Sequence, residues 1–362
     1  MDRRLRAQGC LLALAVGDAM GYTVDDKLWP QIREDYGPDG LRGYDLVNGY
    51  AAVSSYTQLA AMGCCGLLVG LTRGQLRGAT APLIRYMERV GRDWAAMQRR
   101  STGDSICWVA RREELQARRC MEQLMPDSYL RTPCATMTQP TNRFRTPGAL
   151  PLAVAAGMTL DPKQIPRQQI SRLGAEAVAL THGHPMAFLS GGALAWLVNV
   201  IVWDGEKLTG ELVREACQDL RGNFAGEFPQ AGELSAVLNA AVAAARLPGP
   251  LQEKLERLEP DSADRVLAGA ILSILACPED PDGALIAAVN HSGRSAACGC
   301  VTGALLGAQL GVDNIPDFYL DCLEAEPILR QLAQDVGQGS TTGRDSGLFD
   351  DEWDRKYVQW GR

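Results

Sequence analysis

A glycine-spaced stretch lies near the start of the chain and reads Gly9-Cys10-Leu11-Leu12-Ala13-Leu14-Ala15-Val16-Gly17-Asp18-Ala19-Met20-Gly21. Small residues recur at every fourth position, and residues four apart share one face of an α-helix. A face without bulky side chains lets another backbone approach closely, so the stretch predicts a tightly packed core helix. Asp18 is the exception, because a carboxylate in an apolar helix needs a hydrogen-bonding partner or water.

The rest of the chain also has the composition of a helical protein. Aromatic residues make up only 6% of the 362 residues, while alanine, leucine and glycine are abundant and β-branched alternation is scarce. Apolar residues at helical spacing predict helices over residues 6–20, 56–71, 83–94, 150–158, 169–181, 186–202, 210–220, 231–244, 262–276, 283–290, 297–310 and 327–336. We therefore predict an all-α fold, with residues 186–202, which are apolar nearly all round, as a central helix.

No linker divides the chain into parts of different composition. The longest segments that we expect to be irregular are Asp25–Val53, Thr132–Gly148 and Gly337–Asp350. A length prior of roughly 100–200 residues per domain would suggest two or three domains. The even composition instead favours a single domain over residues 1–362, in which long loops would build the functional site.

Charge and composition argue against several classes of function. The net charge is −7, so no basic excess exists to neutralise the phosphates of nucleic acid. The eleven cysteines form no paired Cys-x-x-Cys pattern, which argues against structural zinc and favours reduced cysteines that pack as small apolar residues. No apolar run reaches the ~20 residues that cross a bilayer, and the short run before Asp18 makes a poor secretion signal. We expect a cytoplasmic protein without nucleic-acid or membrane partners.

A second motif, Ser54-Ser55-Tyr56-Thr57-Gln58, stands directly before an apolar helical segment. A serine hydroxyl at this place can accept the free N–H groups of the first helical turn, so one interpretation is a helix cap. The other interpretation is a binding site, because a helix N-terminus attracts anions. Spacing does not separate the two, and Ser54, Ser55, Tyr56 and Thr57 are therefore candidate ligand-binding residues.

Two histidines, His182 and His184, lie where glycine and proline end a predicted helix. Residues at i and i+2 do not face each other on a helix, and the sequence nearby offers no third metal ligand. The motif therefore favours hydroxyl and imidazole groups that satisfy the polar groups of helix ends.

A third motif, residues 290–308, is a turn of small polar residues that leads into a helix with glycine at every fourth position from Gly299. Such a turn can line a pocket, and Arg294 at its centre would carry a positive charge into that pocket. Asn290, Arg294 and Ser295 are therefore further candidates for ligand binding.

Taken in order, these motifs resemble the ADP-ribosylglycohydrolase family, the family of the dinitrogenase-reductase-activating glycohydrolase. The resemblance runs from about Arg6 to Leu310 and rests on Gly-Cys-Leu-Leu-x-Leu-Ala-Val-Gly-Asp-Ala-Met-Gly, Ser-x-x-Thr-Gln, Leu-Thr-His-Gly-His-Pro and Ala-Val-Asn-x-x-Gly-x-Ser. It implies a single-domain orthogonal bundle of many helices. It also implies a cleft in which two magnesium or manganese ions bind ADP-ribose and position water to hydrolyse an N- or O-glycosidic bond.

The residues at the implied metal positions depart from the family pattern. The family's Thr-Asp-Asp-Thr-Gln matches residues 54–58, which places Ser55 and Tyr56 at its two aspartates. Its Gly-Gly-Asp-Thr-Asp-Thr matches residues 292–297, which places Arg294 and Ala296 at the other two. The local formal charge changes by about five units, and a fixed guanidinium repels a dication. Because magnesium and manganese need carboxylate oxygens, we predict no dinuclear metal site and no metal cofactor.

Two more departures concern the surroundings of the cleft. Asp25 matches a family glutamate and is one carbon shorter. Residues 142–151 stand where family members have a glycine-rich turn, which is missing here.

We favour the hypothesis that the chain is a catalytically degenerate family member that binds a small anionic ligand, similar to ADP-ribose, or a protein partner. A second hypothesis is an enzyme with metal-independent chemistry, in which Asp25, Asp18 or His182 is the general base and Arg294 holds an anionic substrate. A third is residual hydrolysis of ADP-ribose linkages through ligands that the sequence does not reveal.

Overall fold

The computed structural model describes residues 1–25, 27–79, 81–99, 105–340 and 350–359. Over these residues the regular structure is helical, and no β-strand forms beyond two isolated β-bridges. The helices are α1 (Arg3–Tyr22), α2 (Trp29–Tyr36), α3 (Ser55–Arg77), α4 (Ile84–Arg99), α5 (Met125–Leu130), α6 (Leu150–Thr159), α7 (Arg167–Ala179), α8 (Pro185–Asp204), α9 (Gly210–Phe224), α10 (Gln230–Arg246), α11 (Leu251–Leu258), α12 (Ala263–Ala276), α13 (Pro281–Val289), α14 (Ser295–Leu310), α15 (Asp317–Asp321), α16 (Glu326–Gln338) and α17 (Asp351–Tyr357), with short 3-10 turns at Trp108–Arg111, Glu113–Leu115 and Val312–Asn314. The predicted all-α class is confirmed.

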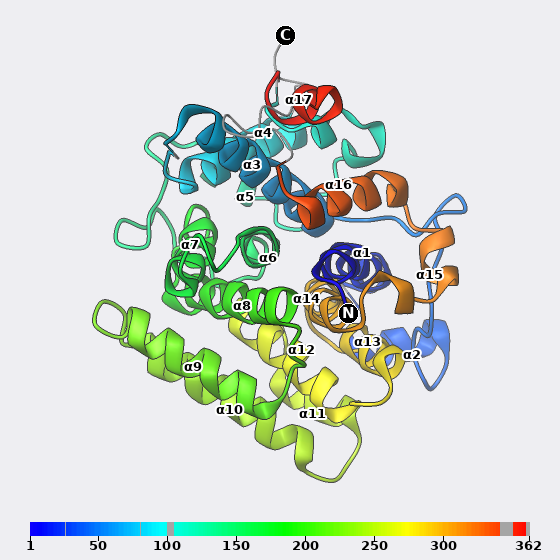
Figure 1. The fold of residues 1–362 in the computed structure, drawn as a ribbon. Coiled ribbons are helices and arrows are strands. Elements are labelled where there is room, and N and C mark those ends of the chain that lie inside the picture. Colours follow the sequence, from blue (N-terminus) through cyan, green and yellow to red (C-terminus); the bar gives the residue numbers. More distant parts are fainter. Residues whose placement is uncertain (26, 80, 100–104, 341–349, 360–362) are drawn as a thin grey trace.

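Helices α1 and α14 lie side by side at the centre of the molecule (Figure 1). Their contact, which we call the α1–α14 seam, pairs Gly9 with Gly307, Ala13 with Gly303, Gly17 with Gly299, and Gly21 with Ser295 and Ala296. A Cβ added to any of these glycines would overlap backbone atoms of the opposite helix. Residue numbers increase along α1 as those of their partners on α14 decrease, so the two helices are antiparallel. The end of α1 therefore meets the start of α14.

Other helices surround the seam in an orthogonal arrangement. Helix α8 is buried along nearly its whole length and packs against α6, α7 and α14, which confirms it as a central helix. Helices α3 and α16 lie on one side of α1, while α12 and α13 support α14 and α9 to α11 form an outer layer (Figure 1). One large apolar cluster runs through the centre, and a small one of Val24, Ile32 and Leu41 lies under α2.

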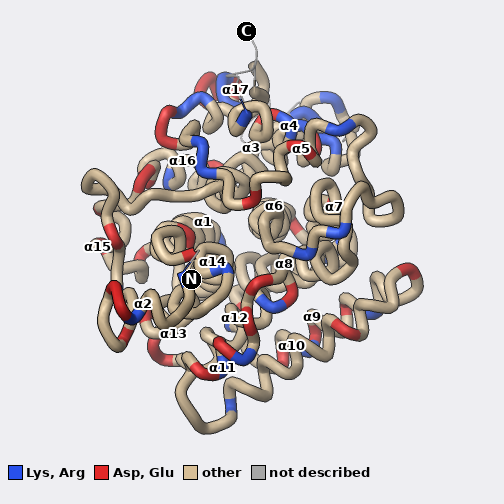
Figure 2. The backbone as a smooth tube through the Cα atoms, turned by 180° about the vertical axis from the view of Figure 1, so that it is seen from behind, with Lys and Arg blue, Asp and Glu red and all other residues tan. Residues whose placement is uncertain are grey.

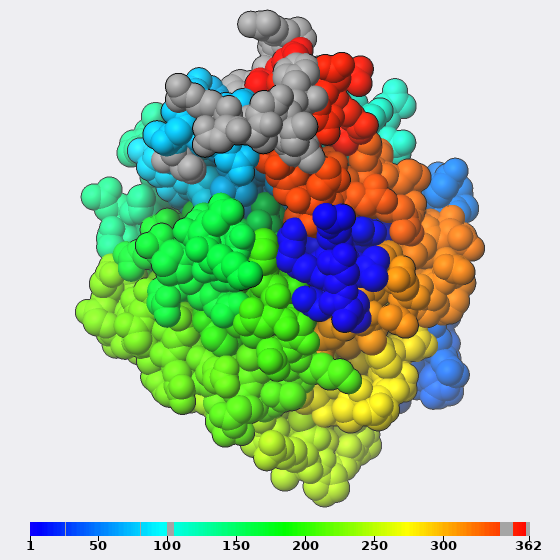
Figure 3. Space-filling view, viewed as in Figure 1, coloured from blue at the N-terminus to red at the C-terminus, as the bar shows by residue number. Residues whose placement is uncertain are grey.

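The beginning of α1 reaches the surface, where its arginines bind neighbouring helices. Arg6 Nε donates to the carbonyl oxygen of Val202 at 2.8 Å, and Arg3 donates to the carbonyl oxygens of Val336 and Gly337. In the space-filling view the dark blue N-terminal part of the chain fills the surface between the green helices and the orange α16 (Figure 3). The N-terminus of the described chain is thus fixed to both sides of the bundle.

The predicted helices all occur, with ends that differ by a few residues. Helix α2 corrects the expectation that Asp25–Val53 is irregular. Its apolar face, the buried Ile32 with the partly buried Trp29 and Tyr36, spans only two turns. Thr132–Gly148 contains no helix, as expected, whereas most of Gly337–Asp350 lies outside the described residues.

Two helices have the length and hydropathy to span a bilayer, which corrects the expectation that no apolar run reaches that length. They are α3 and α8, with mean hydropathy 1.3 and 1.8 over their most apolar windows. Those windows are 78% and 94% buried inside the structure, as in the core helices of globular proteins. Charged residues lie mainly on the outer helices and loops, and few occur on the central ones (Figure 2). All eleven cysteines are free, and seven of them are buried.

Candidate functional site

The end of α1, the start of α3 and the start of α14 meet in one place, which we call the three-helix junction. The antiparallel seam brings Gly21 against Ser295, and Asp18 lies one turn earlier on α1. Ser54, the N-cap residue of α3, hydrogen-bonds to that aspartate. The junction therefore gathers the first two sequence motifs and the start of the third.

Asp18 is fully buried and caps α3. Its Oδ1 accepts the Ser54 hydroxyl at 2.6 Å, and its Oδ2 accepts the Ser54 amide at 2.9 Å and the Thr57 amide and hydroxyl at 3.1 and 2.6 Å. Burial raises the pKa of the Asp18 carboxyl, and these four hydrogen bonds oppose the rise. The arrangement supplies the partner that the sequence demanded for Asp18 and commits both carboxylate oxygens to the scaffold.

The serines of the second motif are likewise engaged. Ser54 Oγ accepts the amide of Tyr56 at 3.2 Å, which confirms the predicted cap. Ser55 binds the neighbouring loop, because its amide donates to the Arg119 carbonyl at 3.1 Å and its hydroxyl accepts the Met121 amide at 3.1 Å. Their role in ligand binding stays a prediction.

Arg294 and Asp25 form the charged centre of the junction. Arg294 Nε lies 3.4 Å from Asp25 Oδ2, and Nη2 donates to the Met121 carbonyl at 3.2 Å. Asp25 Oδ1 accepts the Ala296 amide at 2.8 Å, in the first turn of α14. The Asp25 side chain is 1% exposed and the Arg294 side chain 23% exposed, so the guanidinium is the part of this pair that solvent can reach.

Tyr56 adds a buried phenol to this pair. Burial and the nearby Asp25 carboxylate raise the pKa of Tyr56 well above its usual value, although the Arg294 guanidinium opposes them. Burial lowers the pKa of Arg294, but Tyr56 and Asp25 outweigh it and leave that pKa above its usual value. Arg294 is therefore a permanent cation, and Tyr56 is a neutral phenol at neutral pH.

A carboxylate that the sequence analysis missed, Glu122, approaches the junction from the loop before α5. Its Oε2 lies 2.8 Å from His182 Nε2 and accepts the Thr146 hydroxyl at 2.8 Å, while Oε1 accepts the Gly148 amide at 2.8 Å. Burial raises the pKa of Glu122, but the nearby His182, Thr146 and Arg294 outweigh it and hold that pKa below its usual value. Glu122 is thus an ionised, nearly buried carboxylate beside Arg294.

His182 and His184 have different surroundings. His182 is fully buried, and its Nδ1 lies 2.8 Å from the Thr181 hydroxyl, opposite the contact with Glu122. His184 Nδ1 accepts the Met186 amide at 3.1 Å and caps α8. The prediction that imidazoles satisfy helix ends is therefore confirmed for His184, whereas His182 joins a chain that runs from Thr181 to Glu122.

The third motif contributes structural contacts. Asn290 Oδ1 accepts the Leu41 amide and Asn290 Nδ2 donates to the Leu41 carbonyl, both at 2.8 Å. These two hydrogen bonds hold the loop after α2 in place. Ser295 Oγ donates to the His291 carbonyl at 3.3 Å. His291 is fully buried with no hydrogen-bond partner for either ring nitrogen among the described residues, and burial lowers its pKa to about 4. Ligand binding by Asn290 and Ser295 stays a prediction.

The irregular segment of residues 142–148 is held by its side chains. Asn142 Oδ1 accepts the amides of Phe144 and Gly183, both at 3.0 Å. Arg145 makes two parallel hydrogen bonds, 2.8 and 2.6 Å long, to the buried carboxylate of Asp264 on α12. Such bidentate pairs fix geometry strongly, so the segment is anchored beside α8 and α12.

The residues at the junction do not fit a pair of divalent cations. A guanidinium and a phenol, Arg294 and Tyr56, stand at two of the implied ligand positions, and Asp25 is already bound to Arg294 and the Ala296 amide. Within the described part of the chain, no three side chains of the His, Cys, Asp or Glu types come together as a metal site would require. The exposed part of the Arg294 guanidinium leaves a positive charge within reach of solvent at the junction.

Comparisons with known proteins agree with the fold. A family model described as ADP-ribosylglycohydrolase matches residues 1–345. Among the 47 matching chains of solved structures, one titled "ADP-ribosylglycohydrolase-related protein complex" is similar with a TM-score of 0.58. It is 22% identical in sequence, over 94% of this chain and 99% of that chain, and a likeness at this identity shows the fold alone. A comparison with curated protein sequences gave no match.

Proposed function

This chain belongs to the ADP-ribosylglycohydrolase family, and we propose that it is a catalytically degenerate member that binds a ligand or a protein without metal-dependent hydrolysis. The proposal rests on one observation. The Arg294 guanidinium is paired with the buried Asp25 at the start of α14, and in the sequence motif Arg294 matches one of the family's metal-binding aspartates. An internal cation replaces the charge that bound metals would supply.

Electrostatics support this proposal. A divalent ion beside a fixed guanidinium would be repelled by several kcal/mol at the effective dielectric of about 20 found near protein surfaces. Asp25 and Glu122, the carboxylates beside Arg294, already accept hydrogen bonds from the protein. A metal would have to displace those donors and leave them buried without partners, at a cost of about 1–3 kcal/mol each.

The ligand that we propose for the junction is a small anion similar to ADP-ribose. Arg294 would bind its phosphate, because guanidinium and phosphate form paired, charge-assisted hydrogen bonds. Ser54 and Thr57 already direct their hydroxyls to Asp18, so Arg294 is the candidate whose side chain is best placed to meet a ligand.

The deciding experiment measures binding and turnover together. ADP-ribose is titrated into the protein by calorimetry with and without magnesium, and an ADP-ribosylated protein is incubated with the chain under the same two conditions. We expect no release of ADP-ribose and no effect of magnesium on either binding or melting temperature. Turnover that depends on magnesium would overturn the proposal and support residual metal-dependent hydrolysis.

Arg294 can be tested by a charge-balanced pair of variants. Arg294→Met alone leaves the Asp25 carboxylate buried without its cation, which we expect to destabilise the fold by about 3–5 kcal/mol. Asp25→Asn combined with Arg294→Met removes both charges and should lose less stability. If Arg294 binds the anion, the double variant loses ADP-ribose affinity while Arg257→Met, at an exposed arginine of α11, keeps it. Equal affinity of both variants would exclude Arg294 as the ligand-binding residue.

A second candidate function, hydrolysis without metal, is favoured by one observation. The ionised Glu122 is oriented by hydrogen bonds with His182, Thr146 and Gly148. It lies beside Arg294, whose side chain is partly exposed to solvent. This is an arrangement in which a carboxylate could act as a general base toward water. Release of ADP-ribose in the presence of EDTA, abolished by Glu122→Gln, would support this function over the degenerate one.

We also propose, from sequence alone, that residues 1–362 form one domain and that the protein is cytoplasmic. A single cooperative unfolding transition in calorimetry would support the first proposal. Fractionation of the cells that express it would test the second.

A further inference from the structure

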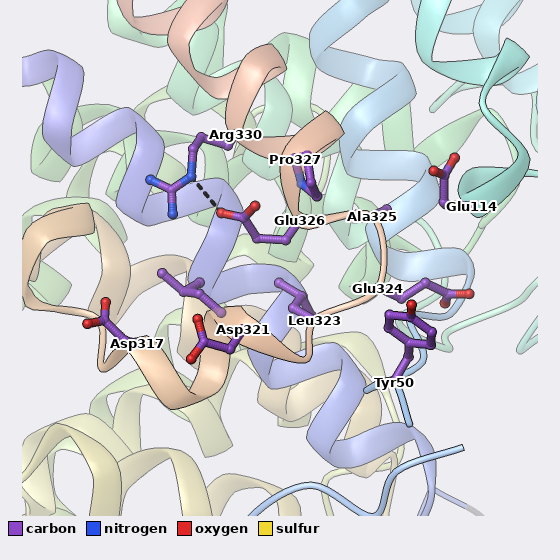
Figure 4. Close-up of a pocket in the computed structure, with 11 residues that line it drawn as sticks. Tyr50, Glu114, Asp317, Asp321, Leu323, Glu324, Ala325, Glu326, Pro327 and Arg330 are labelled. Atoms are coloured by element: carbon purple, nitrogen blue, oxygen red, sulfur yellow. Dashed lines mark hydrogen bonds and ion pairs between the residues drawn. The ribbon is translucent and has the colours of Figure 1, made fainter. Parts of the chain in front are cut away.

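Two hollows flank the short helix α15. One is a cavity of about 670 Å³ between α15, α16 and the loop that holds Tyr50 (Figure 4). The other is an apolar groove of about 220 Å³, lined by Leu285, Leu306, Leu310 and Ile315. Tyr319 of α15 lines the groove and Asp317 and Asp321 line the cavity, so the helix separates the two.

The charge around the cavity is negative. Its charged lining residues are five acids and one arginine, namely Glu114, Asp317, Asp321, Glu324, Glu326 and Arg330. Arg330 is bound to Glu326 at 2.5 Å, and Glu324 is bound by Arg119 from behind the cavity wall. Glu114, Asp317 and Asp321 are exposed and form no ion pair with any described residue. Three uncompensated carboxylates therefore face this hollow and attract cations.

Apolar side chains are exposed beside the same cavity. Of the nine large hydrophobic residues that the described chain exposes, Leu46, Val47, Tyr50 and Phe318 belong to the loop before α3 or to α15. Tyr50 and Phe318 are each 60% exposed. The loop is fixed to α15, since Tyr44 packs edge-on against Tyr319 with ring centroids 5.6 Å apart and the Ala51 amide donates to the Cys322 carbonyl at 2.8 Å.

Exposed aromatic residues beside charged, hollow surfaces are typical of protein interfaces. We propose that the surface around α15, which comprises residues 44–51, α15 and the two hollows, docks a protein segment that presents an apolar side chain flanked by arginine or lysine. The apolar side chain enters the groove beside Tyr319, and the basic side chains lie over Asp317 and Asp321. This inference goes beyond the proposed function, because it concerns residues other than those of the junction and holds whether or not the junction hydrolyses ADP-ribose.

The partner is expected to be basic because its charges must match those of the surface. Arginine forms paired hydrogen bonds with carboxylates, and opposite charge speeds encounter and suppresses wrong partners. A nucleic acid does not fit, since its phosphates would meet the uncompensated carboxylates. A second copy of this chain fits less well, because each copy carries a net charge of −7.

The test uses a short fluorescent peptide with two leucines between arginines, and a matched peptide in which glutamate replaces each arginine. Fluorescence anisotropy with the full-length protein should show binding of the arginine peptide and none of the glutamate peptide. The variants Phe318→Ser and Asp317→Asn/Asp321→Asn should each bind the arginine peptide roughly ten-fold more weakly or worse, as expected for loss of an anchor or of opposite charge. All three residues are exposed, so the fold should be retained and circular dichroism will check it.

A control variant distinguishes binding at the surface around α15 from general attraction of the peptide to the negative net charge of the protein. Glu215→Gln/Glu233→Gln changes net charge by the same amount on α9 and α10, and both residues are exposed. It should leave peptide affinity unchanged. Equal loss in both double variants, or no loss in either, would overturn the proposal. Sedimentation that shows self-association, abolished by Asp317→Asn/Asp321→Asn, would replace the basic partner with a second copy.

Discussion

The α1–α14 seam and the three-helix junction adjoin each other on the same two helices, but different forces hold them. The seam brings backbone against backbone through glycine and leaves no room for side chains. The junction is held by side-chain hydrogen bonds and charges around Asp18, Asp25 and Arg294. The difference teaches that backbone packing and side-chain hydrogen bonding hold adjacent parts of the same helices, so each is tested by its own substitutions.

The strongest test of the seam is Gly17→Ala. The added Cβ would overlap the carbonyl oxygen of Gly299, and only separation of the helices could relieve the clash. We expect the free energy of unfolding to fall by about 4 kcal/mol or more, beyond the usual cost of overpacking. Urea denaturation followed by circular dichroism measures it. A loss under about 1 kcal/mol would show that the seam adjusts and that the contrast with the junction is overstated.

At the junction, Asp18→Ala should also be strongly destabilising. It leaves buried hydroxyl and amide donors of Ser54 and Thr57 without an acceptor, which we expect to cost about 3 kcal/mol or more. The matched control is Asp2→Ala, which removes the exposed aspartate cap of α1 and should cost about 1 kcal/mol. Similar losses for both, by urea denaturation, would mean that burial adds nothing to the Asp18 cap.

Acid should weaken the junction through His291. The pKa of His291 is lowered to about 4 in the folded protein, whereas in the unfolded chain it has its usual value of 6.5. Between these two pH values the unfolded chain therefore binds a proton that the folded protein does not. Stability should therefore fall as pH drops from 6.5 towards 4, by up to about 3 kcal/mol, with no further loss from this group below that. His291→Leu should remove this part of the pH dependence. Identical pH profiles of unfolding free energy for the variant and the parent would refute it.

The smallest expected effect lies outside both regions, at Gly222 of α9. A Cβ there meets nothing within 4 Å, in contrast to Gly17. Gly222→Ala should stabilise the protein by about 0.5–1 kcal/mol, because alanine loses less backbone freedom on folding. Thermal unfolding measures the change. Destabilisation instead would indicate that glycine is needed at α9 for a reason other than close packing.

The sequence predicted the seam's components better than the junction's contacts. Glycine at every fourth position signals a close helix contact, and both helices of the seam carry it. The pattern did not predict that these two helices pair with each other, because α1 and α14 are nearly 300 residues apart in the chain. Their glycine faces are also alike, so spacing alone does not identify the partner of either helix. Helix α2 was missed because its apolar face, Trp29, Ile32 and Tyr36, spans only eight residues, which is shorter than the windows in which helical periodicity is recognised.

Glu122 shows why the site was harder to predict. It stands in a loop without pattern, and its partners Thr146, Gly148 and His182 are 24 to 60 residues away. No local signal marks such a residue, because only the fold brings the segments together. Asp18 and Ser54 were recognised for the opposite reason, since a carboxylate in an apolar helix and a serine before one are anomalies within a few residues.

For protein engineering, the seam makes this molecule a scaffold whose side chains at the junction can be replaced. Its two helices are aligned by the shape of their backbones, so the end of α1 and the start of α14 are fixed relative to each other before any side chain at that end is chosen. Rigid elements of this kind hold introduced groups with the accuracy that designed sites require. New binding specificities can thus be sampled by varying the residues at that end, with the glycine codons of α1 and α14 kept constant throughout the library.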